Sequence, residues 1–148
     1  MVELDPQANR LYQAEDAAFR VERTSPRLSL YAMQVAANAL TDAPWWHDRY
    51  PHVRTLVVRD GRGYTTARVG LDNSLQLPHR SRVRYILVHE ATHRVDPTGT
   101  EDHGAVFTGL YLFMVGKVYG AYRKSVLAKE FRAREVIWDR KIATTGRP

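Results

Sequence analysis

The stretch of sequence that decides the fold reads His89-Glu90-Ala91-Thr92-His93, and after nine residues the chain continues with His103-Gly104-Ala105-Val106-Phe107. On an α-helix, residues four apart lie about 40° from each other around the axis. The first stretch therefore predicts a helix on which His89 and His93 point the same way, one turn apart. The helical period puts Glu90 about 100° from His89, beside the pair rather than between its members.

The chemistry of this pattern is that of a hydrolytic metal site. A zinc ion coordinated by two imidazoles lowers the pKa of a bound water. A neighbouring glutamate can take a proton from that water while the water attacks a carbonyl. Glu90 is therefore the candidate catalytic residue, and His89 and His93 are candidate metal ligands. The alternative is an amphipathic helix that exposes two histidines, with Glu90 as a solvated neighbour.

A catalytic zinc site takes three protein ligands and keeps an open fourth position. We predict His103 as the third ligand, because residues 104–129 contain no Asp or Glu that could serve from the next helix. Three acidic residues could ligate instead or orient an imidazole through its N–H group, namely Asp96, Glu101 and Asp102. The predicted cofactor is one Zn²⁺ ion on His and carboxylate ligands, since the chain has no cysteine.

Length and composition predict one globular domain spanning residues 1–148, with its core at about 53–136 and a frayed tail at 144–148. The 148 residues are 44% hydrophobic and 26% charged, which is ordinary for a soluble protein. No run of 18 apolar residues occurs, and the first residues have no signal-peptide pattern. We therefore expect a cytoplasmic protein with no membrane partner, whereas the oligomeric state stays open.

Hydrophobic periodicity predicts an α+β fold with helices at both ends of the chain. Residues 6–23 and 28–40 have helical spacing of apolar side chains. Three short apolar stretches bounded by turns predict a small antiparallel sheet, at residues 53–59, 64–69 and 74–77.

The aromatic cluster that follows the second helix consists of Trp45, Trp46 and Tyr50. Such a cluster could stack on nucleobases, but we predict that it fills the edge of a core.

Downstream of the sheet, the pattern predicts three further helices. The metal helix should begin after an N-cap at Ser81 and end near Val95. A long apolar helix follows His103, and a basic helix covers about Ala121 to Val136.

The third predicted strand offers a candidate substrate-binding site. Pro78 ends this strand and cannot donate to a sheet ladder, so we expect the strand at an edge. An exposed edge can bind an extended peptide by strand addition. The candidate residues for binding a peptide or protein substrate are Leu75, Gln76 and Leu77.

The positive charge is concentrated at the C-terminal end of the chain. The formal net charge is +6, and residues 117–148 hold nine Lys or Arg against three Asp or Glu. A basic helix of this kind can be a solvated face or can contact nucleic acid. The candidate nucleic-acid-binding residues are Arg123, Lys124, Lys129, Arg132 and Arg134.

The chain resembles the zincin metallopeptidases, and more narrowly the small HExxH metallohydrolases of bacteria and their phages. Three segments carry this resemblance, which covers roughly residues 53–136: Ser74–Pro78, Val88–His93 and His103–Phe107. The third segment is similar to the third-ligand segment of SprT-like and Wss1-like proteases, which act on proteins crosslinked to DNA.

The resemblance implies a zincin-like, minimal metalloprotease fold with zinc on His89, His93 and His103 and with Glu90 as general base. It also implies that Gly104 allows close chain approach and that Phe107 packs behind the ligand.

The sequence thus predicts a zinc-dependent hydrolase, specifically a metallopeptidase that uses a zinc-activated water. One alternative is a nucleic-acid- or protein-binding module with a structural zinc site, and another is a degenerate zincin that serves as an interaction or immunity protein. The group that stabilises the oxyanion stays open among several arginines and three tyrosines, Tyr111, Tyr119 and Tyr122.

Overall fold

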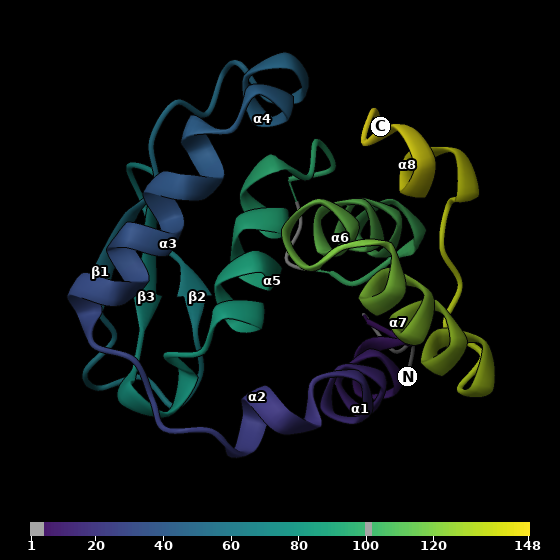
Figure 1. The fold of residues 1–148 in the computed structure, drawn as a ribbon, viewed down its shortest axis with the longest axis horizontal. Helices are drawn as coiled ribbons and strands as arrows, with labels where there is room; N and C mark the ends of the chain where they lie inside the picture. Colours follow the sequence, from purple (N-terminus) through teal and green to yellow (C-terminus); the bar gives the residue numbers. More distant parts are fainter. Residues whose placement is uncertain (1–4, 100–101) are drawn as a thin grey trace. The chain divides into compact units, whose positions relative to one another are not determined.

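A computed structural model of the chain describes residues 5–99 and 102–148 (Figure 1). Within these ranges it contains eight α-helices, one 3-10 helix and one three-stranded sheet. The α+β prediction is therefore confirmed. The described residues divide into two compact units, one formed by residues 24–95 and the other by the described parts of 1–23 and 96–148. That the whole chain is one domain stays a prediction.

The unit of residues 24–95 contains the sheet. Its strands β1 (Val57–Asp60), β2 (Arg68–Val69) and β3 (Ser74–Leu77) lie in the order β1-β3-β2. β1 runs parallel to β3, and β2 runs antiparallel to it. The sheet is therefore mixed, and the prediction of an antiparallel sheet was wrong.

The physical reason lies in the turn after β1. The sequence Asp60-Gly61-Arg62-Gly63 is typical of a hairpin, but Gly61 packs directly against the backbone of Pro78, at the end of β3. β3 is thereby paired between the other two strands, with Leu75 and Leu77 fully buried. The prediction that β3 is an edge strand was also wrong.

Two long helices contact this sheet. Helix α3 (Leu30–Asp42) contacts β1, and helix α5 (Arg84–Val95) contacts β2, β3 and α3. The side chain of Gln34, on α3, makes two hydrogen bonds to the backbone of β1 and the residue before it. Its Nε2 donates to the Leu56 carbonyl at 2.8 Å, and its Oε1 accepts from Val58 N at 2.7 Å. Gln34 therefore occupies two backbone hydrogen-bonding groups on the side of β1 that faces away from β3.

The aromatic cluster belongs to the core of the same unit. Trp46 lies in helix α4 (Pro44–Arg49) and Tyr50 follows it, and both are at most 1% exposed. The Trp46 indole donates to the Val53 carbonyl at 2.7 Å, so its polar group is satisfied inside the core. The core prediction is confirmed for these two residues, whereas Trp45 is only half-buried.

The second unit is helical in its described part. It contains α1 (Ala8–Ala18), α6 (Ala105–Tyr119), α7 (Ala121–Ala133) and α8 (Arg140–Thr145), and α2 (Arg20–Thr24) lies at its boundary. α6 packs against α7 and α8, and α1 packs against α7 (Figure 1).

Two glycines shape the path of α6. Gly109 allows α8 to approach, because a Cβ there would lie 2.7 Å from the Asp139 carbonyl. Gly120, with φ of 95°, separates α6 from α7 in a conformation that other residues avoid.

Helix α8 was not predicted. Asp139 caps it by accepting from Ile142 N at 3.0 Å, and Gly146 ends it in the left-handed region. Thr144 and Thr145, in the tail expected to fray, form its last turn.

The most apolar helix of the described residues, α6, has 15 residues. No helix in the described part of the chain has the length and hydropathy needed to cross a membrane.

Replacing Trp46 by Ala should lower the free energy of unfolding by about 3–5 kcal/mol, because a fully buried indole leaves a cavity and the Val53 carbonyl loses its donor. The control Trp45→Ala should cost about 1 kcal/mol, since this side chain is half-buried. Urea unfolding followed by circular dichroism measures both. Equal losses for the two variants would contradict the assignment of Trp46 to the core.

Candidate metal centre

The first part of the site is the pair of histidines on α5. The helix begins at Arg84, three residues after Ser81, which lies instead in the 3-10 helix η1 (His79–Ser81). His89 and His93 lie one turn apart with ring centroids separated by 5.0 Å. The predicted pairing of the two imidazoles on one helix is confirmed.

Burial separates this pair from the alternative of two exposed histidines. His89 is 4% exposed and Glu90 is 8% exposed, while His93 is half-buried. A carboxylate and an imidazole are seldom buried to this extent unless other groups compensate for lost hydration. The interpretation of Glu90 as a solvated surface residue is therefore wrong.

The second part of the site is His103, which precedes α6 and is 4% exposed. Its Nδ1 lies 2.7 Å from Asp5 Oδ2, and its backbone N–H donates to Asp5 Oδ1 at 3.2 Å. Its carbonyl accepts a hydrogen bond from Gln7 Nε2 at 2.5 Å. His103 is thus held at its ring and at both of its backbone polar groups.

The neighbours of His103 support one implication of the resemblance and correct another. Phe107 lies edge-on to the His103 ring with centroids 4.9 Å apart, as expected for a residue packed behind a ligand. A Cβ on Gly104 would meet no atom of the described residues within 4 Å. The close chain approach expected at Gly104 is therefore wrong.

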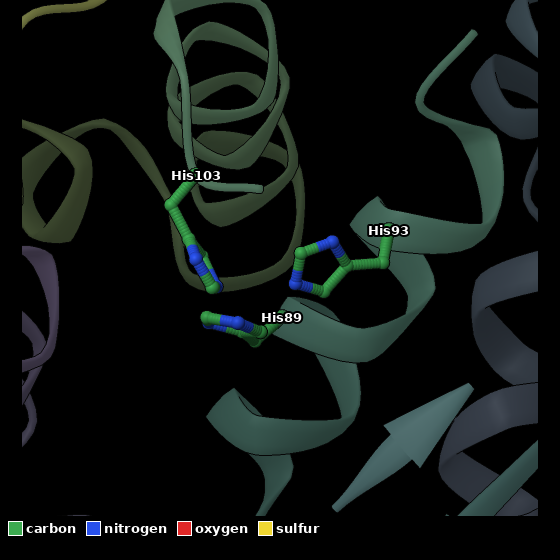
Figure 2. A group of neighbouring side chains, drawn as sticks. All are labelled: His89, His93 and His103. Atoms are coloured by element: carbon green, nitrogen blue, oxygen red, sulfur yellow. The ribbon is translucent and has the colours of Figure 1, made fainter. Parts of the chain in front are cut away.

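The three histidine side chains form one group, with His89 and His93 from α5 and His103 from the segment before α6 (Figure 2). Each offers one ring nitrogen, and these nitrogens lie within 4.8 Å of one another. Nitrogens that share a tetrahedral zinc lie about 3.4 Å apart, which is within this limit. The group could hold one metal ion, and three neutral imidazoles are donors that suit zinc and other transition metals.

The acidic alternatives for the third ligand have other places. Asp96 accepts from the backbone N–H and the hydroxyl of Thr98 at 2.9 and 2.8 Å, which stabilises the turn after α5. Asp102 is exposed, and Glu101 lies outside the described residues. Among the described residues, the group that could hold an ion here consists of the three histidines.

Asp5 and Tyr12 are site residues that the sequence did not predict. Asp5 lies 98 positions from its partner His103, and the N-terminal helix had no pattern beyond amphipathic spacing. The Tyr12 hydroxyl lies 3.3 Å from His103 Nε2, and the two rings meet edge-on.

The three tyrosines considered from the sequence for oxyanion stabilisation differ in their burial and ring contacts. Tyr111 is fully buried and stacks on Phe107, whereas Tyr119 packs on Phe19 and Tyr122 is 81% exposed. The Tyr12 phenol, by contrast, lies beside a candidate ligand, His103.

The predicted substrate-binding residues lie in the centre of the sheet. Leu75 and Leu77 are fully buried, and Gln76 is half-buried between Arg59 and Arg68 in register. Strand addition to β3 requires a free side, which this strand lacks. A role of these residues in substrate binding stays a prediction, without the edge-strand argument that suggested it.

The five candidate nucleic-acid-binding residues comprise four on α7 and Arg134 directly after it, and four of the five have partners within their own unit. Arg123 bonds to Glu22 at 2.6 Å, and Lys124 donates to the Ala143 carbonyl at 2.6 Å. Arg134 pairs with Glu130, and Arg132 lies over Trp138. Lys129 is exposed. Burial, and to a lesser extent nearby Lys117, lowers the pKa of Lys124. Nucleic-acid binding by this helix stays a prediction.

No family model, curated protein or solved structure matches the chain. The zincin-like fold and the peptidase activity are therefore supported by motif and chemistry alone, and they stay predictions.

Arg123→Ala should lower the free energy of unfolding by about 1–2 kcal/mol, because it removes a charge-assisted hydrogen bond to Glu22 and a cation–π contact with Phe19. The control Lys129→Ala should change it by less than about 0.5 kcal/mol. Thermal or urea unfolding measures both. If Arg123→Ala is as stable as the control, the internal contacts of Arg123 do not contribute to stability, and its side chain could bind a partner instead.

Proposed function

We propose that the chain is a zinc-dependent hydrolase, specifically a metallopeptidase, in which His89, His93 and His103 hold one Zn²⁺ ion. The observation that carries the proposal is the group of three histidines, two of them buried, with their nitrogens within 4.8 Å of one another. The donor set fits zinc, since three imidazoles are a ligand combination of catalytic zinc sites and leave one position open.

Glu90 is the general base of this proposal. It follows His89 directly on α5 and is 8% exposed, so its carboxylate is largely shielded from bulk water. Zinc, when bound, supplies a Lewis acid that polarises a carbonyl and acidifies water. The Glu90 carboxylate takes the proton from the attacking water and can pass it to the leaving amine.

An extended peptide is the substrate class that this arrangement favours, and the sheet offers one place for it. β3 is paired on both sides, and Gln34 occupies hydrogen-bonding groups beside β1. A substrate strand would therefore pair with the outer side of β2 at Arg68 and Val69. α5 contacts this same strand, which would bring the peptide to the helix of His89 and Glu90.

The first experiment measures metal content in protein purified without chelators. We expect one equivalent of zinc, which His103→Ala should remove and the exposed control His52→Ala should retain. Glu90→Gln should keep the zinc while turnover of an unfolded polypeptide falls about 10²–10⁴-fold, because the base is lost.

Two results would overturn the proposal. One is less than roughly a tenth of an equivalent of zinc with no uptake on titration, which would remove the metal centre. The other is unchanged turnover in Glu90→Gln, which would remove Glu90 from its role.

The alternative of a nucleic-acid-binding module with a structural zinc site is less well supported. Four of the five basic candidate residues on α7 and directly after it have internal partners. A structural zinc would have a fourth protein ligand, whereas the hydrolase requires an exchangeable one. Nucleic-acid affinity that falls steeply with salt would favour the module.

A further inference from the structure

The feature that carries the inference is the attachment of His103 to the N-terminal segment. Asp5 uses both carboxylate oxygens on His103, one at the ring Nδ1 and one at the backbone N–H. Gln7 binds the His103 carbonyl and also bonds to both backbone groups of Ile137, at 2.9 and 3.0 Å. Residues 5 and 7 therefore fix the position of this histidine relative to the chain beyond α7.

These contacts determine which ring nitrogen of His103 carries the proton. A neutral imidazole has one N–H and one lone pair, and an ionised carboxylate can only accept. Nδ1, at 2.7 Å from Asp5, must then be the donor, which leaves the lone pair on Nε2. The Tyr12 hydroxyl, 3.3 Å from Nε2, can donate to that lone pair in the absence of a metal, and an ion bound to Nε2 would replace this contact.

We propose that Asp5 is a positioning residue that holds His103 in the Nδ1–H tautomer and so presents Nε2 to the metal ion. The metal part of this proposal rests on the proposed function. An imidazole that ligates through one nitrogen usually donates its other N–H to a carboxylate or carbonyl, which fixes the ring and raises its basicity. Asp5 and Tyr12, far from the motif in sequence, thereby contact a candidate ligand of the metal centre.

The Asp5→Asn substitution tests this arrangement because it keeps the size of the side chain and reverses one hydrogen-bonding role. If the amide oxygen keeps the bond to the His103 backbone N–H, the amide nitrogen takes the place of Oδ2 beside Nδ1. Nδ1 then faces a donor and must accept, so the ring proton moves to Nε2. The lone pair that the metal needs is no longer on Nε2.

The matched control is Asp16→Asn, which removes the same charge from α1. Asp16 is half-exposed and forms a loose ion pair with Arg23, at 3.7 Å. Any general effect of one fewer negative charge near the N-terminus appears in both variants. An effect through the His103 ring appears in Asp5→Asn alone.

The experiment has two readouts besides turnover. Ring ¹⁵N NMR on zinc-free protein at alkaline pH should report Nδ1–H for His103 in the wild type and in Asp16→Asn, and Nε2–H in Asp5→Asn. Competition with a chromophoric chelator should give a zinc Kd about 10–100-fold higher in Asp5→Asn and unchanged in the control. Thermal unfolding of the zinc-free proteins checks that both variants fold.

The proposal is overturned if zinc-free wild-type protein carries the proton on Nε2, or if Asp5→Asn binds zinc within about twofold of the wild type. Should Asp5→Asn not fold, the wild-type tautomer still decides between these outcomes. A wild type that shows the Nδ1–H tautomer but takes up no zinc would refute the proposed function, while leaving the Asp5–His103 arrangement intact.

Discussion

The helical period is the physical constraint on which the candidate metal centre depends. Four residues on a helix place two side chains one turn apart, so His89 and His93 meet only while α5 keeps its regular hydrogen bonding. The sheet and α3 pack against α5 and bury most of its residues. At the end of the helix, Arg94 bonds to Asn73 at 2.5 Å, in the turn before β3. The unit of residues 24–95 therefore stabilises the conformation that two ligands require.

His103 lies outside any helix or strand and needs a different kind of support. A residue before the first turn of a helix has a backbone N–H and carbonyl that the helix does not satisfy. When these groups are buried, leaving either without a hydrogen bond costs free energy. Asp5 and Gln7 satisfy the N–H and the carbonyl of His103, and Asp5 also binds the ring. The N-terminal segment thus has two effects, since the bonds that stabilise the backbone at His103 also orient its imidazole.

The features that were predicted correctly depend on residues close together in the sequence. The HExxH spacing predicted the helix and its pair of imidazoles, and the absence of acidic residues after His103 singled out the third histidine. The position of β3 depends on how Gly61 packs against Pro78, which is not a property of either turn alone. Asp5 was missed because no periodicity links residues 98 positions apart. For α8, the signals of Asp139 and Gly146 were present, but six residues give too little periodicity to reveal a helix.

The donor set is the basis for proposing a catalytic rather than a purely structural metal site. Structural zinc is closed by four protein ligands, most often with thiolates, and this chain has no cysteine. Among the described residues, the group that could hold an ion consists of the three histidines, while Asp96 is hydrogen-bonded to Thr98 and Asp5 to His103. Three neutral imidazoles leave the full positive charge on a bound ion, which makes it a stronger Lewis acid than one neutralised by anionic ligands. In the proposed hydrolase, the buried carboxylate of Glu90 next to His89 would serve as the base that takes the proton of the acidified water.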